Sequence, residues 1–285
     1  MSTIQPPINY TGSKYRLMGQ LLPHLPQGIE TLYDYFGGSA CVALNLAEYA
    51  NEVVYNDRDL NLTNLMEYLY ETPEQEIVPA VRAVIEEHGL GKGEKENFHA
   101  YRDYFNQDTF GNTPAEFIAL IYHSFSSNIR YNRAGDKITS SSGGSEAFFR
   151  QCHEKRLVEA SKHFKKVPWR FTALDLFEID WDEPQEYDFV YLDPSYLASG
   201  ETMYSHHWKE DHERYLLAKL DELNARGVNF ALSNVLYNKG HTNPILEEWC
   251  KKYKVIELSM SYKNASHQKH EGKELPTREV LIINY

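Results

Sequence analysis

The chain has little cysteine and no long hydrophobic run. Its three cysteines, Cys41, Cys152 and Cys250, lie far apart and form neither a CxxC metal-binding spacing nor a disulfide framework. No stretch approaches the ~18 uninterrupted apolar residues of a membrane span. The first residues, MSTIQPPINYTGSKYR, lack the apolar core and cleavage site of a secretion signal. These absences predict a protein of the reducing cytoplasm that has no membrane partner and no cysteine-based metal site.

Two common nucleotide-binding fingerprints are also missing. Neither GxGxxG nor GxxxxGK[ST] occurs, which argues against an ordinary dinucleotide or triphosphate loop. Hydrophobic residues, by contrast, make up 42% of the 285 residues. The chain can therefore bury the core of one large domain, or of one α/β domain that carries a sizeable insertion.

Acidic residues outnumber basic ones, but not evenly along the chain. The net charge is −12, which by itself argues against nucleic acid as a partner. Residues 120–170 nevertheless contain ten basic residues and only four acidic ones. One basic segment in an acidic protein indicates either a local polyanion-binding face or the solvated surface of a helix, and charge alone does not separate the two.

Strand and helix patterns alternate at both ends of the chain. The strand patterns are ETLYDYF (30–36), EVVYND (52–57), WRFTAL (169–174), YDFVYL (187–192) and VNFALSN (228–234). KVIELSMSY (254–262) and REVLIINY (278–285) predict a closing antiparallel pair. Such alternation predicts an α/β fold whose sheet is mostly parallel, with an antiparallel strand at its C-terminal edge.

The middle of the chain breaks this alternation. Helical spacing continues from about residue 60 to 125, a polar loop or hairpin rich in Gly, Ser and Asn follows near 128–145, and a basic helix is expected over about 146–164. We therefore predict a sheet domain made of residues 1–60 and 166–285, with a mainly helical module, residues 61–165, inserted between its halves.

Acidic residues follow several of the predicted strands, at the edge where open parallel sheets bind ligands. Asp34 precedes a glycine turn (36–39), where the backbone can turn tightly and approach a ligand. Asp57 ends the second strand, where an acid suits the hydroxyls of a ribose, although it could equally cap the helix that starts near Leu60. Asp175 follows WRFTAL and is open to the same two interpretations.

The segment DPSY (193–196) ends a fully apolar strand pattern. Proline fixes its own φ and pushes Asp193 to an extended conformation, which holds the carboxylate at the strand tip. A carboxylate beside a backbone carbonyl offers two acceptors for the two hydrogens of an exocyclic amine. The Tyr196 ring beside them can stack on a planar base. Taken alone, DPSY is also compatible with a plain Asp-Pro turn.

In their order along the chain, these motifs resemble the Dam-type family of DNA adenine-N6 methyltransferases. NYTGSKYRL (9–17) looks like the family's N-terminal motif, DYFGGSACVALN (34–45) like its cofactor loop, and YND (55–57) like the acidic strand end that follows. RYNRAG (130–135) is similar to its DNA-contacting hairpin, and DPSY to its catalytic D-P-P-Y. KEDHERYLLAKL, LSN (232–234) and REVLIINY match later elements of the family.

The resemblance implies a Rossmann-like methyltransferase sheet and an inserted target-recognition domain. It implies methyl transfer, without a metal, from S-adenosylmethionine to N6 of an adenine flipped out of double-stranded DNA, which leaves S-adenosylhomocysteine. The cofactor contacts that it implies are Tyr10, Lys14, Asp34, Phe36, Gly37, Gly38, Ser39, Asp57, Asp175 and Asp193. The catalytic residues would be Asp193, Pro194 and Tyr196, and the DNA contacts would be Arg130, Asn132, Arg133 and Lys137.

The resemblance also implies a monomer in the cytoplasm of a bacterial or phage-infected cell. In a restriction–modification setting, a cognate restriction endonuclease would be a second partner besides DNA.

Two positions depart from the family pattern. Ala40 replaces a glycine of the cofactor loop, which tightens the space near the cofactor. Ser195 replaces the second proline of the catalytic motif, so Pro194 is not forced away from the α region by its successor.

Other interpretations stay open: methylation of cytosine N4, of RNA or of a protein amide, and a catalytically weakened DNA-binding relative. The HHWKEDH cluster (206–212) is interpreted as an exposed loop before a helix, and a metal site is the alternative.

Overall fold

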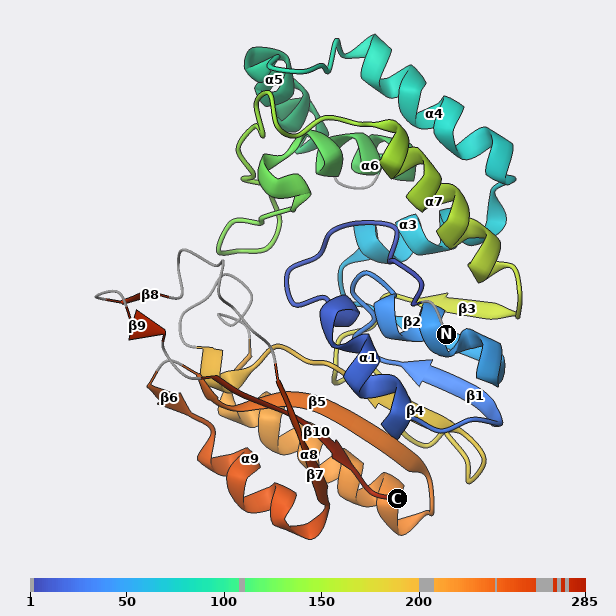
Figure 1. The fold of residues 1–285 in the computed structure, drawn as a ribbon, viewed down its shortest axis with the longest axis vertical. Helices are drawn as coiled ribbons and strands as arrows, with labels where there is room; N and C mark the ends of the chain where they lie inside the picture. The colour runs from blue at the N-terminus through green and yellow to red at the C-terminus, as the bar shows by residue number, and fades with distance from the viewer. Residues whose placement is uncertain are drawn as a thin grey trace.

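The computed structural model describes residues 3–107, 111–199, 208–238, 240–259, 269–270, 273–274 and 277–285. The main sheet has the strand order β3-β2-β1-β4-β5-β10-β7, with β6 paired to β5, and a two-stranded sheet lies apart from it (Figure 1). The strands are β1 (Ile29–Asp34), β2 (Ala50–Asn56), β3 (Trp169–Thr172), β4 (Phe189–Leu192), β5 (Asn229–Asn238), β6 (His241–Thr242), β7 (Lys254–Leu258), β8 (Lys269–His270), β9 (Lys273–Glu274) and β10 (Thr277–Ile283).

The main sheet is parallel except at one side. The pairs β1–β2, β1–β4, β2–β3 and β4–β5 are parallel, whereas β10 runs antiparallel to both β5 and β7. The predicted fold class, a mostly parallel Rossmann-like sheet with an antiparallel strand at its C-terminal edge, is confirmed. The strand order reverses between β1 and β4, and such a switch point is where open α/β sheets bind ligands.

The strand that carries DPSY lies in the middle of this sheet and is covered on both faces. Along β4, Val190 and Leu192 pack in the hydrophobic cluster of α8, while Phe189 and Tyr191 pack in a second cluster on the other face. All four side chains are buried. This double burial is the reason for the uninterrupted apolar run in the sequence.

The helices form the layers on either side of the sheet. They are α1 (Met18–Leu21), α2 (Cys41–Leu46), α3 (Leu60–Glu71), α4 (Glu74–Glu87), α5 (Lys95–Phe105), α6 (Pro114–His123), α7 (Gln151–Phe164), α8 (Glu210–Ala225) and α9 (Pro244–Trp249). In Figure 1, α4 to α7 form a separate tier beyond α3, and α8 and α9 lie beside β5, β7 and β10.

The helical tier is packed onto the sheet through a continuous core. Helix α3 contacts β3 as well as α6 and α7. Leu62 of α3, Phe117 of α6 and Leu157 of α7 belong to the same hydrophobic cluster as Leu32 of β1. The division into residues 1–60 with 166–285, and an inserted module at 61–165, stays a prediction. What the structure adds is that α3 joins the two parts.

Candidate active site

The carboxyl ends of β1, β2 and β4 bring three of the predicted acids together. Asp34 is level with Tyr55 of β2 and with Tyr191 of β4 in the sheet register. Asp57 and Asp193 each lie two residues beyond those partners. The charges of Asp193 and Asp57 are near enough to act on the ionisation of Asp34. The three acids therefore lie at one edge of the sheet, beside the switch point.

Asp34 is a buried carboxyl with an unused acceptor. It is 1% exposed, and its Oδ1 atom has no hydrogen-bond partner among the described residues. Burial is the main cause that raises the pKa of Asp34 to about 8, and the charges of Asp193 and Asp57 add to it. A buried carboxyl with a free oxygen at a ligand-binding edge can receive a cationic or N–H group from a ligand.

The turn after β1 approaches its neighbours so closely that it requires glycine. A Cβ atom at Gly37 would lie 2.0 Å from the Tyr55 ring, and one at Gly38, where φ is +50°, would lie 2.8 Å from the Tyr10 ring. The Tyr55 hydroxyl donates to Gly38 O at 2.7 Å. The Tyr10 ring of the N-terminal motif thus lies against the glycine turn.

Two further residues of this turn contact other parts of the chain. The Ser39 hydroxyl lies 3.4 Å from the Ser13 hydroxyl. Phe36 is half-buried and meets Trp208 edge-on, with the ring centroids 5.8 Å apart. The turn is therefore fixed both by the N-terminal motif and by the segment that leads into α8.

Asp57 holds the glycine turn and does not cap α3. Its Oδ2 atom accepts from Gly38 N at 2.9 Å, and its Oδ1 atom accepts from Asp59 N at 2.8 Å. The N-cap of α3 is Asp59, whose side chain accepts from Asn61 N at 3.0 Å. The helix-cap interpretation of Asp57 is therefore wrong. Burial raises the pKa of Asp57 to about 6.

Lys14 joins the N-terminal motif to the loop after β4. Its Nζ atom lies 2.6 Å from Asp193 Oδ2 and 2.6 Å from the Tyr196 hydroxyl, which in turn donates to Asp193 Oδ1 at 2.8 Å. Between them, the lysine and the tyrosine thus bond to both oxygens of the Asp193 carboxylate. Of the two residues between Asp193 and Tyr196, Pro194 is buried and Ser195 is partly exposed.

A second carboxylate stabilises the charge of Lys14. Glu279 of β10 is 5% exposed, and its Oε1 atom lies 3.7 Å from Lys14 Nζ. Burial by itself lowers the pKa of Lys14, but the carboxylates of Asp193 and Glu279 outweigh it and raise that pKa above its ordinary value. Lys14 is therefore a buried cation between two acids.

Asp175 lies at the rim of the site. Its Oδ1 atom accepts from Phe177 N at 3.3 Å, and its Oδ2 atom lies 3.4 Å from Arg58. Leu174 and Phe177 on either side are exposed apolar residues. Asn56 ties this segment to the β2 end, because its side chain bonds to Leu174 N and Leu174 O and to Tyr35 O.

A hairpin follows α6 over residues 128–142: Tyr131 pairs with Ile138, and Ser142 at its end pairs with Ser124. It carries three of the predicted DNA contacts on its surface. Arg130, Arg133 and Lys137 are exposed, and none of them forms an ion pair within the described part of the chain. Asn132 is engaged inside the hairpin instead. Its Oδ1 atom accepts from Gly135 N, Asp136 N and Lys137 N, and its Nδ2 atom donates to Asp136 at 2.7 Å. Asn132 therefore fixes the shape of the loop that presents the cations.

Several other basic residues of the 120–170 segment have structural partners. The Arg156 guanidinium donates to Pro6 O, Ile8 O and Asn9 Oδ1. Lys162 pairs with Glu159, Lys165 with Glu74 and Arg170 with Glu183. Among the described residues, the hairpin thus carries cations without an ion-pair partner, whereas Arg156 and Lys162 of α7 are engaged. The polyanion-binding interpretation of the hairpin stays a prediction.

Sequence reasoning missed Glu279, Asn56 and Arg156. Glu279 lies in the strand pattern REVLIINY, where a charge among apolar residues was the available signal. Asn56 directly precedes Asp57, the acid that marks the end of the second predicted strand. Arg156 was counted only as part of the basic segment. Its role in holding residues 6–9, just before Tyr10, depends on a contact across almost 150 positions of the chain.

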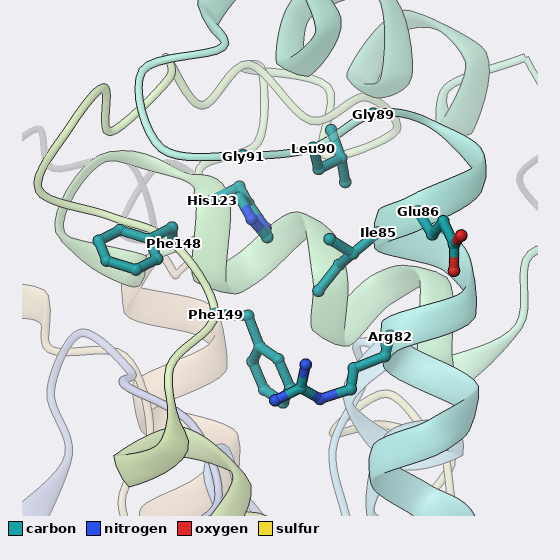
Figure 2. A pocket seen from close by; sticks show the side chains of 9 residues that line it. All are labelled: Arg82, Ile85, Glu86, Gly89, Leu90, Gly91, His123, Phe148 and Phe149. Carbon is teal, nitrogen blue, oxygen red and sulfur yellow. The ribbon is translucent and has the colours of Figure 1, made fainter.

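A separate hollow lies in the helical tier. It has a volume of about 460 Å³ and is lined by Arg82, Ile85, Glu86, Gly89, Leu90, Gly91, His123, Phe148 and Phe149 (Figure 2). None of the predicted site residues lines it.

No three His, Cys, Asp or Glu side chains among the described residues gather so that they could hold a metal ion. His206 and His207 of the HHWKEDH cluster lie outside the described residues, and His212 packs against Trp208 and Phe177. Within the described ranges, no helix is both long and apolar enough to cross a membrane.

Comparison with known proteins gives matches along the whole chain. Residues 10–264 match the D12 class N6 adenine-specific DNA methyltransferase family. Type II methyltransferase M.FokI of Planomicrobium okeanokoites is 32% identical over 289 residues, which cover all of this chain and 43% of that protein. Modification methylase StsI of Streptococcus sanguinis is 31% identical, with 99% and 43% covered. The chain thus spans less than half the length of these relatives.

Among solved structures, an rRNA methyltransferase, aviRa of Streptomyces viridochromogenes, aligns over 95% of this chain and 84% of its own, with 12% identity and a TM-score of 0.39. A likeness at this level does not bear on function.

The strand order and the reversal between β1 and β4 define a Rossmann-like α/β protein, and the three acids lie at the edge where sheets of this kind bind ligands. The match over residues 10–264 then gives the family. The chain belongs to the D12 class N6 adenine-specific DNA methyltransferase family, and the expected relationship to adenine-N6 methyltransferases is confirmed.

Proposed function

We propose that this chain transfers a methyl group from S-adenosylmethionine to N6 of adenine in double-stranded DNA. The observation that supports this most is the position of Asp193. It stands at the tip of the central strand β4, beside the glycine turn of β1, with Lys14 and Tyr196 bonded to its two oxygens. Membership of the D12 class family supports the same reaction.

The residues around the glycine turn fit S-adenosylmethionine. The unpaired Oδ1 atom of buried Asp34 suits the ammonium group of the methionine end. The close packing of Gly37 and Gly38 against the Tyr55 and Tyr10 rings fixes the shape of the turn beside which the methionine end would lie. Asp57 would accept hydrogen bonds from the ribose hydroxyls, and Asp175 and the exposed Phe177 would contact the adenine. S-Adenosylmethionine bound in this way would supply an electrophilic methyl group.

Asp193 and Pro194 would act on the amino group of the target base. Each carboxylate oxygen has about two lone-pair sites, so Asp193 can accept a hydrogen bond from the base while it keeps those from Lys14 and Tyr196. The Pro194 carbonyl would accept the second N–H. Acceptors at both hydrogens favour a more tetrahedral nitrogen and stabilise the positive charge that develops on it during transfer.

Lys14 and Tyr196 would keep the Asp193 carboxylate in position before the base arrives. A group held by two partners at 2.6 and 2.8 Å needs little reorganisation in the transition state. In this arrangement the Tyr196 ring is also fixed through its hydroxyl, and we propose that its face receives the flipped adenine.

Double-stranded DNA is proposed as substrate because no acid among the described residues pairs with the exposed cations of the hairpin. Arg130, Arg133 and Lys137 would contact phosphates or base edges. Asn132 would act indirectly, by shaping the loop. The target base has to leave the duplex before its amine can meet a methyl donor.

Transfer of a radiolabelled methyl group to duplex DNA tests the proposal, with the product identified by mass spectrometry of the nucleosides. The expected product is N6-methyladenine. Asp193→Ala should reduce the rate roughly 100-fold or more, the usual effect of removing one transition-state contact. Asp182→Ala is the matched control, since the Asp182 side chain is 95% exposed. Near-normal transfer by Asp193→Ala, or a product of N4-methylcytosine or methylated RNA, would overturn the proposal.

We also propose the setting in which the chain acts. Two relatives are named as modification methylases, which supports a cognate restriction endonuclease that reads the same DNA site. The setting would then be the cytoplasm of a bacterial or phage-infected cell, with the chain acting as a monomer. Light scattering of the purified chain, with and without a duplex, measures the oligomeric state.

A further inference from the structure

The turn between α6 and the 128–142 hairpin has an unusual backbone. Ser126 has a φ of +57° and Ser127 a φ of +50°, so two successive residues that are not glycine adopt the left-handed conformation. Phe125, directly before them, is 53% exposed, and its ring makes no aromatic contact with the described residues. Unfavourable conformations of this kind persist only where the surrounding structure holds them, and they concentrate at ligand-binding positions.

Hydrogen bonds hold this turn from several sides. Phe125 N donates to Ser141 O at 2.8 Å, which fixes the turn to the end of the hairpin. Ser127 N donates to Ser124 O at 2.8 Å, and Asn128 N donates to Phe125 O at 3.3 Å. The Phe125 ring is therefore presented to solvent from a backbone that has little freedom.

The turn also touches the N-terminal motif. Asn9 Nδ2 donates to Ser126 O at 3.4 Å, and Asn9 Oδ1 accepts from Arg156 at 2.7 Å. The next residue, Tyr10, lies against Gly38 of the cofactor turn. The turn that carries Phe125 is thus bonded on one side to the end of the hairpin and on the other to the N-terminal motif. In Figure 1 the hairpin, between α6 and α7, descends from the helical tier on the side toward which the arrowheads of β1 and β3 point.

We propose that Phe125 stacks on a base of the bound duplex next to the adenine that leaves the helix. An aromatic side chain is costly to expose to water but gains from stacking on any base, since every base has a π-face. A turn that is already rigid loses little further conformational freedom when it binds. The proposal rests on the proposed function, because it requires duplex DNA as the substrate.

The experiment compares Phe125→Ala with the parent chain, using a duplex that carries 2-aminopurine beside the target adenine. We expect the variant to bind DNA at least about fivefold more weakly, the lower limit for loss of one base–aromatic stack. Its 2-aminopurine fluorescence on binding should also differ from that of the parent. The affinity for S-adenosylhomocysteine should stay unchanged, because Phe125 is not among the residues that we expect to contact the cofactor.

Two further variants separate stacking from a general effect on folding. Tyr187→Ala removes an aromatic residue that is 77% exposed and lies at the opposite end of β4, and it should leave DNA binding unchanged. Phe125→Trp should retain affinity, and its additional tryptophan fluorescence should be quenched by DNA. A Phe125→Ala variant with parental DNA affinity and parental 2-aminopurine signal overturns the inference. If the parent chain methylates DNA in the same experiment, the proposed function is unaffected by that result. A parent chain that neither binds nor methylates duplex DNA overturns both.

Discussion

Lys14 is a buried cation with one partner nearby in the sequence and three from distant parts of the chain. Gly12 precedes it by two residues, Asp193 and Tyr196 follow β4, and Glu279 lies in β10. Removal of one member of a buried ion pair leaves the other charge without compensation, which is more harmful than loss of the attraction alone. Lys14 is therefore expected to matter for stability as well as for chemistry.

Lys14→Met should lower both the rate of methyl transfer and the free energy of unfolding. Without Lys14, Asp193 and Glu279 share buried surroundings with no cation between them. The loss of stability should be about 2–3 kcal/mol, somewhat below the ~3–5 kcal/mol for a fully buried pair, because the Asp193 side chain is 17% exposed. Urea denaturation and the methylation assay measure the two effects. Lys162→Met, at an exposed pair on α7, is the control, and parental stability of Lys14→Met would contradict this role.

The ionisation of Asp34 should make ligand binding depend on pH. In the folded chain the pKa of Asp34 is raised from 3.8 to about 8, so the folded state keeps a proton there that the unfolded state loses, and stability falls as pH rises from about 4 to about 8. A cationic ammonium group favours the ionised carboxylate. Binding of S-adenosylhomocysteine at pH 7 should therefore release a proton, and its affinity should rise between pH 6 and 8.

Calorimetry of this binding in buffers with different ionisation enthalpies measures the proton release directly. Asp34→Asn should abolish the release and weaken binding. Asp57, whose pKa is raised to about 6, is mostly ionised at pH 7 and should contribute less. Binding enthalpies that do not depend on the buffer would show that Asp34 does not meet the ligand's cation.

Among the elements, the loop after β1 shows most clearly how local sequence and tertiary contacts combine. The sequence shows Gly37 and Gly38 as a tight turn. Glycine is needed at both positions because a Cβ atom would collide with the rings of Tyr55 and Tyr10, which come from other segments. Ala40 ends the same loop as the N-cap of α2, with a φ of +56° and no exposed surface. The departure of this residue from the family's glycine therefore places a Cβ atom in the left-handed conformation.

Ala40→Gly should stabilise the chain by about 1 kcal/mol. An L-residue in the left-handed conformation costs roughly 1–2 kcal/mol, which glycine does not, but the greater freedom of glycine in the unfolded chain offsets part of this gain. Thermal unfolding measures the change. Gly38→Ala is the opposite control: it has a φ of +50° and would meet the Tyr10 ring at 2.8 Å, so it should lower both stability and cofactor affinity. A destabilised Ala40→Gly variant would mean that the methyl group is needed for packing.

At the scale of the whole molecule, acidic and basic regions are separated in space. The sheet edge gathers Asp34, Asp57 and Asp193, while the free cations lie on the hairpin of the helical tier. The net charge of −12 thus hides a local basic surface. Binding of a polyanion should depend on this surface and not on the basic residues of α7 that are already paired.

Replacement of Arg130, Arg133 and Lys137 by alanine should weaken DNA binding and flatten its salt dependence. Each phosphate contact contributes a slope of about −0.9 to the logarithm of affinity against the logarithm of salt concentration, so loss of three contacts should reduce the slope by about 2–3. Fluorescence anisotropy over a range of salt concentrations measures this. The matched control replaces Lys162, Lys219 and Lys251, each of which pairs with a glutamate three residues away. Equal slopes for the two triple variants would place the DNA elsewhere.

The sequence by itself determined the fold class, because strand and helix periodicity depend on local burial. It indicated the family, because the motifs occur in the family's order along the chain, although Ser195 in DPSY and Ala40 after the glycine turn depart from its pattern. It also predicted which strand ends carry acids, although it could not choose between ligand binding and helix capping for Asp57. The structure excludes the cap, because Asp59 takes that position and Asp57 accepts from Gly38 N instead, and ligand binding by Asp57 stays a prediction.

Only the tertiary structure decided which of these residues meet. Contacts of Lys14 with Asp193 and Glu279, of Asp57 with Gly38, and of Arg156 with residues 6–9 join segments that no periodicity relates. The same holds for the division of the basic segment, since whether a cation is free or paired depends on acids brought close by packing. Hydrophobic patterning specifies which face of an element is buried, but the neighbours of a polar side chain follow from how the faces are packed together.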